Sequence, residues 1–546
     1  MSFSKGLNAG GATDTSNRTA KSTSPFSGMC TTCQEGCPGL CEVGRSAFRG
    51  REVLYPTPYG ETTFASQKDY PVDFSHFNIM GTTIGAKGIK ADSDLANFSA
   101  VSVKSRVGAK KPIPLRLPIV IPGLGSTRVA ADNWEGLAAG AALSGVILTI
   151  GENVGGMDGK ALIKGGRLVR SPNLKKRVQA FRRWQGNSGE IVLQSNVEDT
   201  RLGVLEYALQ ELGVTAVELK WGQGAKNIGG EVKVKSLKEA LKLKERGYLV
   251  YPDPRDPHVQ ESFSLGYIKE FERHSRVGMV AEETFLQRVA ELRRLGAVHV
   301  FLKTGAYRPA DLARAVKFAS KARIDLLTVD GAGGGTGMSP WRMMNEWGLP
   351  TVYLESLLHE FLQRLKSRGE FIPHICVAGG FSLEDQVFKG LALGAPFVKA
   401  IGMARPPLAA VMVGKTLERF ILKGKVPAWI AKKYGSSREE VFVTMEGLKD
   451  LLGQRMEGLP PGAAGLYTYF ERLKTGLQQL MCGARIFKLA YLTRRDIAAL
   501  TREAAQVSGI PYIMDLDRDE AIRILDETGD REEAFFKSYR SCSGRP

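Results

Sequence analysis

The feature that most constrains the fold is a repeated alternation of short β-branched runs with amphipathic helical stretches, which begins near residue 112. Each run ends in a Gly-rich turn, and the segment that follows has apolar residues at i, i+3 and i+4. We interpret the runs as strands, beginning at Leu115, Gly145, Gly189, Ala216, Gly296, Ile324, His374 and Phe397. Strands separated by helices pair in parallel through right-handed crossovers.

Eight strand–helix units over about 300 residues predict an α/β protein with a closed (β/α)8 TIM barrel. A doubly wound open sheet is the alternative, but its G-x-G-x-x-G fingerprint is missing, because Thr336 and Met338 stand where its last glycine would fall. The sequence near Tyr248, YLVYPDPRDP, also has strand character. Its prolines favour an excursion over the barrel mouth rather than a ninth barrel strand.

Additions flank the predicted barrel on both sides. We expect a flexible tail at 1–28, an N-terminal cysteine-rich region at 29–111, the barrel at 112–435 and a C-terminal helical region at 436–546. A hydrophobic content of 43% is that of a globular protein. No apolar run reaches the roughly 18 residues that a membrane span needs, and the N-terminus lacks the apolar core of a signal peptide. We therefore expect a cytoplasmic protein without a membrane span.

Four of the seven cysteines lie close together, with the spacing C-x2-C-x3-C-x3-C: Cys30, Cys33, Cys37 and Cys41. In a large chain without a secretion signal, such a group indicates metal ligation rather than disulfides. The unbroken run, with Pro38 after the third cysteine, favours an iron–sulfur cluster, 3Fe-4S or 4Fe-4S. Structural zinc and unligated thiols are the alternatives. The isolated Cys376, Cys482 and Cys542 are interpreted as small hydrophobes or as a tail thiol.

The net charge of +18 raises the question of an acidic partner. Nine basic residues and no acid lie between Lys160 and Trp184. A solvated loop and helix face is the simplest interpretation, and a docking patch for an acidic redox protein is the alternative. Nucleic acid is not expected as a partner, since aromatic residues hardly interleave with the basic ones.

The predicted carboxyl ends of the strands concentrate glycines and polar residues, and chemistry in a TIM barrel collects at that face. Glycines after the last two strands suit a phosphate site, because backbone N–H groups there are open to an anion. Lys220, Lys226 and Lys303 lie at or just beyond strand ends that should face the mouth.

Two motifs carry a resemblance to a known family. The segment 218–230, ELKWGQGAKNIGG, is similar to the K-x-x-Q-G-A-K-x-x-x-G-G signature of the FMN-binding synthase domain of glutamate synthases. The segment 330–340, DGAGGGTGMSP, is similar to the G-G-T-G-x-S-P loop of that family, and GENVGG at 151–156 resembles its second-strand element. The resemblance extends from about Leu115 to Ile421 and includes more generic FMN-barrel segments at 300–305 and 377–405.

The resemblance implies an FMN-dependent oxidoreductase that reductively aminates 2-oxoglutarate with ammonia to give glutamate, with electrons delivered through an iron–sulfur cluster. It implies that Lys226, Glu152 and Lys220 are catalytic, with Gln223 nearby. Lys303 would neutralise the reduced flavin. The residues implied to bind FMN are Gly123, Gln194, Lys303, Gly334, Gly335, Gly379, Gly380, Gly402 and Met403.

The chain departs from the family in three ways. Bacterial members bind their cluster through cysteines after the last barrel strand, and 397–421 contains none. Ala332-Gly333 replaces a His-Asp pair, which leaves the keto acid open. No glutaminase domain is expected before the barrel, so ammonia would be free or come from a separate glutaminase subunit.

The electron donor expected is ferredoxin or a separate reductase subunit, because no nicotinamide fingerprint is present. This arrangement resembles stand-alone archaeal-type glutamate synthases and methylglutamate synthases. The alternatives are an FMN and iron–sulfur oxidoreductase with a different amine or substrate, and a non-catalytic electron-transfer subunit.

Overall fold

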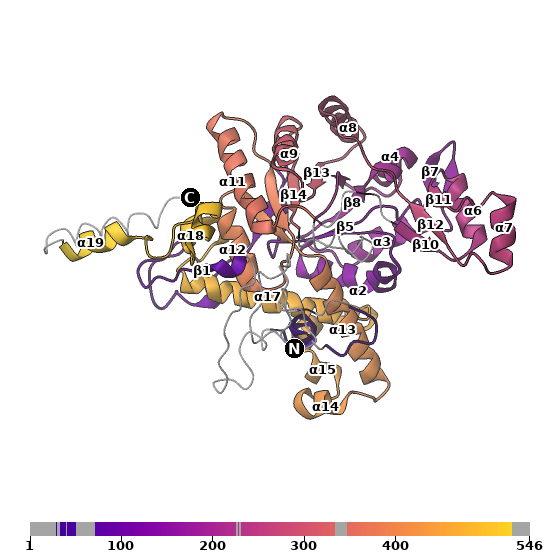
Figure 1. Ribbon diagram of the computed structural model, residues 1–546. Coiled ribbons are helices and arrows are strands. Elements are labelled where there is room, and N and C mark those ends of the chain that lie inside the picture. Colours follow the sequence, from indigo (N-terminus) through magenta and orange to yellow (C-terminus); the bar gives the residue numbers. More distant parts are fainter. Residues whose placement is uncertain are drawn as a thin grey trace, which may run out of the picture.

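The predicted TIM barrel is confirmed. The computed structural model describes residues 29, 33–39, 41–50, 71–224, 228, 231–332 and 347–526. Eight strands form a closed barrel in which each adjacent pair is parallel and the last strand pairs with the first (Figure 1). They are β4 (Ile119–Leu124), β5 (Ile147–Ile150), β8 (Ile191–Ser195), β9 (Ala216–Lys220), β13 (His299–Thr304), β14 (Leu326–Asp330), β15 (His374–Ala378) and β16 (Val398–Gly402).

Helices surround the barrel on the outside. They are α2 (Arg128–Ser144), α3 (Pro172–Arg182), α4 (Val197–Leu202), α5 (Val204–Glu211), α8 (Glu282–Arg294), α9 (Pro309–Lys321), α11 (Thr351–Ser367), α12 (Glu384–Leu393) and α13 (Arg405–Leu422). The long C-terminal helix α17 (Ala463–Gly483) packs across α2, α12 and α13. It comes so close to α2 that a Cβ on Gly140 would lie 2.8 Å from the Cβ of Leu466. Small residues on α2 therefore allow a second helical layer on this side.

A hairpin closes the N-terminal end of the barrel. Strands β2 (Ser105–Val107) and β3 (Ile113–Leu115) pair antiparallel. The hairpin is held at its turn, where Gly108 N–H donates to His374 Nδ1 at 3.1 Å. Its apolar side chains join the lower interior of the barrel in one buried cluster, made of Val107, Ile113, Leu115, Val120, Ile147, Val192, Ala216, Phe301, Leu326, Cys376 and Ala400.

The segment near Tyr248 lies outside the barrel, as predicted. Between β9 and β13 the chain forms a three-stranded antiparallel sheet in the order β10 (Glu231–Val234), β12 (Phe271–His274), β11 (Leu249–Tyr251), with α6 (Leu237–Glu245) and α7 (Pro257–Ser264) (Figure 1, right). We call residues 231–276 the insertion. It is fixed to the turn after β5, because Arg246 Nη1 donates to the carbonyls of Gly156 at 2.6 Å and Asp158 at 2.9 Å.

The described part of the C-terminal flanking region is mainly helical, and one strand pair joins it to the N-terminal flanking region. Helix α1 (Glu42–Arg49) packs against α13 and α17. Strand β17 (Ile497–Ala499), in the region predicted to be helical, pairs antiparallel with β1 (Phe77–Ile79). The remaining helices are α14 (Ala428–Tyr434), α15 (Arg438–Val441), α16 (Met445–Leu452), α18 (Arg502–Ser508) and α19 (Arg518–Asp526). The domain boundaries stay predictions. Within the described ranges, no helix has the length and apolarity to traverse a bilayer.

The basic segment 160–184 forms the hairpin β6 (Leu162–Lys164) and β7 (Arg167–Arg170), followed by α3. One of its nine basic residues is structural rather than solvated. Arg177 is 2% exposed, lies 4.5 Å over the Trp134 ring and donates to the carbonyls of Leu124 and Gly125. The docking interpretation of the other basic residues stays a prediction.

Truncation of Phe301 tests whether the lower interior of the barrel holds the fold together. Phe301 is 1% exposed, so Phe301→Ala should lower the free energy of unfolding in urea by about 3–5 kcal/mol through lost burial and a cavity. Phe98 is 41% exposed, and Phe98→Ala should cost less than about 1 kcal/mol. Equal losses for the two variants would contradict this account of the core.

Candidate functional site

The inward positions of the barrel strands change from apolar to polar toward the carboxyl ends. Side chains two residues apart on a strand point to the same side of the sheet. The residue two positions after a strand member of the buried cluster at the lower end of the barrel therefore also faces the barrel interior. By this rule Val192 is followed by Gln194, Ala216 by Glu218, Phe301 by Lys303 and Leu326 by Thr328. We call Gln194, Glu218, Lys303 and Thr328 the polar layer, and each of them is buried.

Lys303 is the cation of the polar layer. Its Nζ lies 3.0 Å from Oδ2 of Asp330, and Glu218 also faces it. Burial lowers the pKa of Lys303, but the charges of Asp330, Glu218 and Glu152 outweigh burial and raise this pKa above its ordinary value. Burial raises the pKa of Glu218, against the opposing effects of Lys303, Lys220 and a hydrogen bond from Gln194 Nε2. A fixed positive charge therefore lies inside the upper barrel.

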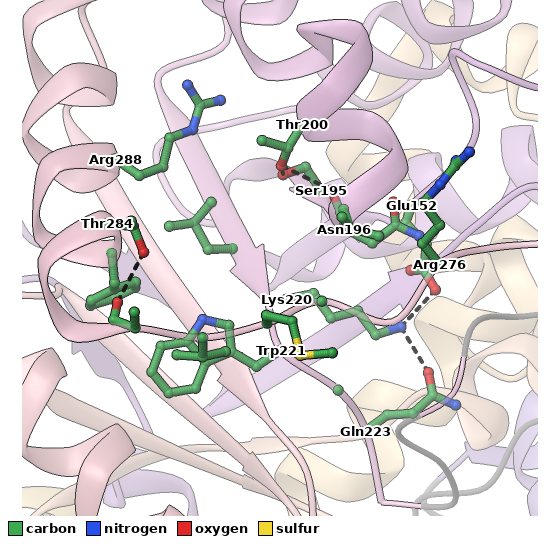
Figure 2. A pocket seen from close by; sticks show the side chains of 18 of the residues that line it. Glu152, Ser195, Asn196, Thr200, Lys220, Trp221, Gln223, Arg276, Thr284 and Arg288 are labelled. Atoms are coloured by element: carbon green, nitrogen blue, oxygen red, sulfur yellow. Dashed lines mark hydrogen bonds and ion pairs between the residues drawn. The ribbon is translucent and has the colours of Figure 1, made fainter. Parts of the chain in front are cut away.

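A second polar group lies at the rim, around Lys220, the register partner of Lys303 on β9 (Figure 2). Lys220, the last residue of β9, donates from Nζ to Glu152 Oε1 and to Gln223 Oε1, each at 2.7 Å. Glu152 lies on the turn after β5, and Gln223 lies on the loop after β9. The structure thus brings together two of the three residues implied to be catalytic. The third, Lys226, lies outside the described residues.

A cavity of about 280 Å³ opens beside this pair. It lies at the carboxyl ends of β8 and β9, under the start of α8 (Figure 2). Its wall combines apolar side chains with two arginines, and among the residues that the sequence did not single out are Trp221, Arg276, Met279, Phe285 and Arg288. Both arginines are paired with carboxylates, Arg276 with Glu198 and Arg288 with Glu206 and Glu291. The cavity therefore offers a mainly apolar wall beside the Lys220–Glu152 pair.

The implied FMN residues lie at the same end of the barrel. Gly379 and Gly380 follow β15 with φ of +117° and +102°, a region that favours glycine. A Cβ on Gly402 would lie 2.7 Å from the Cβ of Ala378, and one on Gly123 would lie 2.6 Å from Gln194 Oε1. Met403 is buried, and its N–H donates to the Val120 carbonyl at 2.9 Å, which helps to close the barrel. Gly334 and Gly335 lie outside the described residues.

Two groups of the polar layer have unused hydrogen-bonding capacity. Gln194 Oε1 and Thr328 Oγ1 are buried, and neither has a hydrogen-bond partner among the described residues. Buried polar atoms are normally paired, so unpaired ones in a candidate site fit a bound polar group. Glu218 and Thr328 were not assigned a role from sequence, although the two-residue alternation after Ala216 and Leu326 would have found both.

Three of the four clustered cysteines are described, and Cys30 is not. Gly39 N–H donates to Cys37 Sγ and Gly44 N–H donates to Cys41 Sγ, each at 3.4 Å. The contact from Gly44 is the N-terminal cap of α1, and N–H groups directed at a sulfur in this way stabilise negative charge on it. Within the described part of the chain, however, no three metal-binding side chains converge on one point.

The cysteine loop 33–41 is attached to two barrel helices. Gly36 N–H donates to Thr416 Oγ1 of α13 at 3.3 Å, and Asn133 Nδ2 of α2 donates to Glu35 Oε1 at 2.8 Å. Helices α2 and α13 follow β4 and β16, the pair that closes the barrel. Of the isolated cysteines, Cys376 is fully buried in the barrel as a small hydrophobe, Cys482 is half-buried, and Cys542 lies outside the described residues.

A barrel with a buried lysine and a lysine–glutamate pair at its carboxyl rim has the layout of an enzyme site. Residues 274–431 match the conserved region of glutamate synthase. The glutamate synthase large subunit-like protein of Rhizobium meliloti (strain 1021) is 27% identical over 426 residues, which cover 74% of this chain and 79% of that protein. The archaeal-type glutamate synthase [NADPH] of Thermotoga maritima is 24% identical over 320 residues, 58% of this chain and 53% of that protein. The chain is therefore similar to glutamate synthases, as its motifs predict.

Among solved structures, the flavin-binding domain of baker's yeast flavocytochrome b2 aligns with 80% of this chain and 80% of its own length. The sequence identity is 13% and the TM-score is 0.44. At this distance the alignment has no bearing on the site.

Replacing Lys303 tests the charge balance of the polar layer. Lys303→Met leaves buried carboxyls without a cation, so the free energy of unfolding should fall by about 3–5 kcal/mol near neutral pH. At acid pH the buried Glu218 carboxyl, whose pKa is raised by burial, is protonated, and the loss should shrink. Urea unfolding at acid and neutral pH measures both, with the exposed Lys317→Met as control. A pH-independent loss would contradict the charge balance.

Proposed function

We propose that this protein is an FMN-dependent oxidoreductase that reductively aminates a 2-oxo acid, 2-oxoglutarate in the first instance, to the amino acid. The observation that carries the proposal is the Lys220–Glu152–Gln223 group at the barrel rim, next to the buried cation of Lys303, which is the register partner of Lys220 on the neighbouring strand. The relation to glutamate synthases supports the choice of reaction.

The residues at the carboxyl end of the barrel fit FMN. The consecutive glycines Gly379 and Gly380 turn the chain with positive φ, and such turns leave backbone N–H groups open to a phosphate. Gln194 and Thr328 offer unpaired polar atoms to the edge of a ring system. Lys303 would offset the negative charge of a reduced flavin. When bound, FMN supplies the hydride.

The other steps belong to side chains of this chain. Lys220 would bind a carboxylate of the keto acid, since its ammonium group already lies between two oxygen acceptors. Glu152 would transfer protons as ammonia adds to the carbonyl carbon and water leaves, a role that a partly exposed carboxyl at hydrogen-bond distance from a lysine can fill. Trp221 and Phe285 form an apolar wall that limits the water in the cavity.

We further propose that Cys30, Cys33, Cys37 and Cys41 bind the iron–sulfur cluster through which electrons arrive. The N–H groups aimed at two of the sulfurs, and the position of the loop on α2 and α13, support this assignment. Ammonia would come free or from a separate glutaminase subunit, and electrons from ferredoxin or a reductase subunit. The protein would act in the cytoplasm.

The decisive experiment is turnover of 2-oxoglutarate and ammonium by the FMN-loaded protein with an artificial reductant. Lys220→Ala should lower kcat/KM at least about a hundredfold, because it removes the cation that binds substrate, while FMN absorbance stays unchanged. Lys317→Ala, an exposed lysine on the outer helix α9, should leave both unchanged. FMN-loaded protein that turns over no keto acid with either ammonium or methylamine would refute the proposed reaction.

The cluster is tested separately. Cys33→Ser should abolish the broad visible absorption and most of the bound iron and sulfide of anaerobically purified protein, because a thiolate ligand is lost. Cys482→Ser, which changes a cysteine far from the group, should retain all three. Zinc in place of iron, or iron unaffected by Cys33→Ser, would overturn the assignment.

A further inference from the structure

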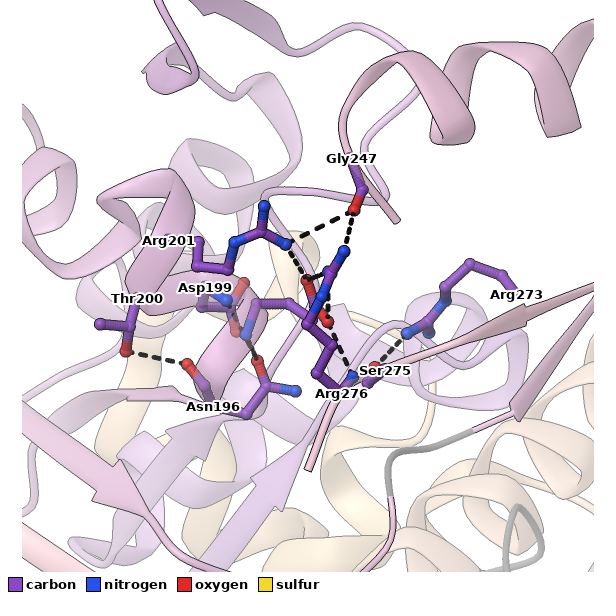
Figure 3. Close-up of polar contacts among 9 residues, drawn as sticks. Asn196, Asp199, Thr200, Arg201, Gly247, Arg273, Ser275 and Arg276 are labelled. Atoms are coloured by element: carbon purple, nitrogen blue, oxygen red, sulfur yellow. Dashed lines mark hydrogen bonds and ion pairs between the residues drawn. The ribbon is translucent and has the colours of Figure 1, made fainter. Parts of the chain in front are cut away.

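A buried acidic residue lies directly behind Glu152. Asp199 belongs to the first turn of α4, which is fixed by the Asn196 cap: Asn196 Oδ1 accepts from the backbone N–H groups of Glu198 at 3.0 Å and Asp199 at 3.1 Å (Figure 3). Asp199 is 1% exposed. Burial of a carboxyl group costs desolvation free energy, so a carboxyl this deeply buried indicates a structural or functional role.

The contact of Asp199 is with the turn that carries Glu152. Its Oδ2 accepts from the backbone N–H of Asn153 at 2.7 Å. Asn153 has a φ of +66°, a left-handed conformation that is uncommon for a residue other than glycine. The hydrogen bond therefore holds the peptide that joins Glu152 to Asn153, and with it the direction in which Glu152 leaves the turn toward Lys220.

The insertion encloses Asp199 from the other side. Arg273 of β12 is fully buried; it donates to Ser275 Oγ, and its Nε and Nη2 have no hydrogen-bond partner among the described residues. It lies 5.2 Å over the ring of Tyr248, whose hydroxyl is likewise buried and unpaired within the described chain. Asp199 Oδ1 also has no hydrogen-bond partner among the described residues. The chain thus encloses a carboxyl, a guanidinium and a phenol with unused hydrogen-bonding capacity behind the candidate site.

The neighbouring residue Glu198 has a different contact. Its carboxylate accepts from the backbone N–H of Arg276 at 2.8 Å and pairs with the Arg276 guanidinium at 2.9 Å (Figure 3). Glu198 therefore anchors the end of the insertion, whereas the hydrogen bond of Asp199 is to the turn that carries Glu152.

We propose that Asp199 is a positioning residue for the Glu152–Lys220 pair: its carboxyl group fixes the turn that carries Glu152, and its negative charge, when present, opposes the binding of a dicarboxylate there. This inference rests on the proposed function. It adds that the site binds its anionic substrate more tightly when Asp199 is protonated, and that the insertion sets the charge of Asp199 through Arg273.

The groups around Asp199 allow its charge to change near neutral pH. Burial raises its pKa to about 7, and the charge of Glu152 on the neighbouring turn acts in the same direction. The backbone N–H groups of Asn153 and Asn196 and the Arg273 guanidinium oppose this rise. Tyr248 also faces Asp199 from the insertion, and Glu198 is its neighbour on α4.

The test is the binding of 2-oxoglutarate to the FMN-loaded protein by calorimetry from about pH 5 to 9. In the wild type, affinity should fall about fivefold as pH rises through the region where Asp199 ionises, because like charges repel. Asp199→Asn keeps an acceptor for Asn153 N–H but no charge, so its affinity should be flat and equal to that of the wild type at acid pH. Arg273→Met removes the opposing cation and should move the wild-type midpoint to higher pH.

Two further variants separate positioning from stability. Asp199→Ala removes the acceptor as well as the charge. At acid pH, where wild-type Asp199 is uncharged, it should lower kcat about tenfold with little change in KM, and Asp199→Asn should keep the wild-type kcat. Asp325→Asn changes a buried carboxyl that accepts Val300 N–H at 3.0 Å at the opposite end of the barrel, and it should keep the wild-type pH response. An unchanged pH response in Asp199→Asn, or an unchanged kcat in Asp199→Ala, would overturn the inference.

Failure of the proposed function would give a different result. If the protein does not act on this 2-oxo acid, the wild type binds no 2-oxoglutarate at any pH. The pH dependence of its free energy of unfolding can still be measured. Because the folded-state pKa of Asp199 is raised, the wild type should lose stability relative to Asp199→Asn as pH rises from about 4 to about 7. Equal pH dependence of unfolding in the two proteins would refute the buried, titrating carboxyl itself.

Discussion

A lysine ammonium group inside a closed barrel needs carboxylate partners, and this requirement organises the upper half of the molecule. Lys303 meets Asp330 from the next strand and faces Glu218 from the previous one, so three adjacent strands share one charge balance. The strand register provides this arrangement, because the register partners of Lys303 are Lys220 and Thr328, and Glu218 and Asp330 each lie two residues from one of these partners on the same strand. Lys220, the centre of the hydrogen-bonded group at the rim, lies two residues after Glu218 on the same strand, β9.

The barrel could be predicted from sequence because its signal is local. Each strand is a short β-branched run, in all cases but β8 closely followed by glycine, and all eight runs became barrel strands. Lys220, Glu152 and Lys303 could be placed at the mouth for the same reason, since they follow or end such runs. Their shared chemistry was suggested by two motifs, both of which continue into residues outside the described ranges.

Long-range contacts could not be predicted in this way. Asp199 and Arg273 are far apart in sequence, and no periodicity connects them. Arg177 belongs to a run of basic residues that suggests a solvated surface, yet it is buried against Trp134. The spacing of the cysteines likewise gives no indication of where their loop attaches. In the structure the loop reaches α13, the helix after the last barrel strand, from the opposite end of the chain. The resemblance implies that bacterial relatives carry their own ligating cysteines near this place.

The hairpin at the N-terminal end has a consequence for how the protein can be divided. Its two strands lie on either side of residue 111, where the sequence suggested that one region ends and the barrel begins. A fragment cut there would lose Val107 from a cluster that also contains Phe301 and Leu326, and would expose apolar surface at the base of the barrel. Autonomous folding of the barrel therefore requires the polypeptide from about Ser105 onward, so the catalytic unit is longer than its strand–helix repeats suggest.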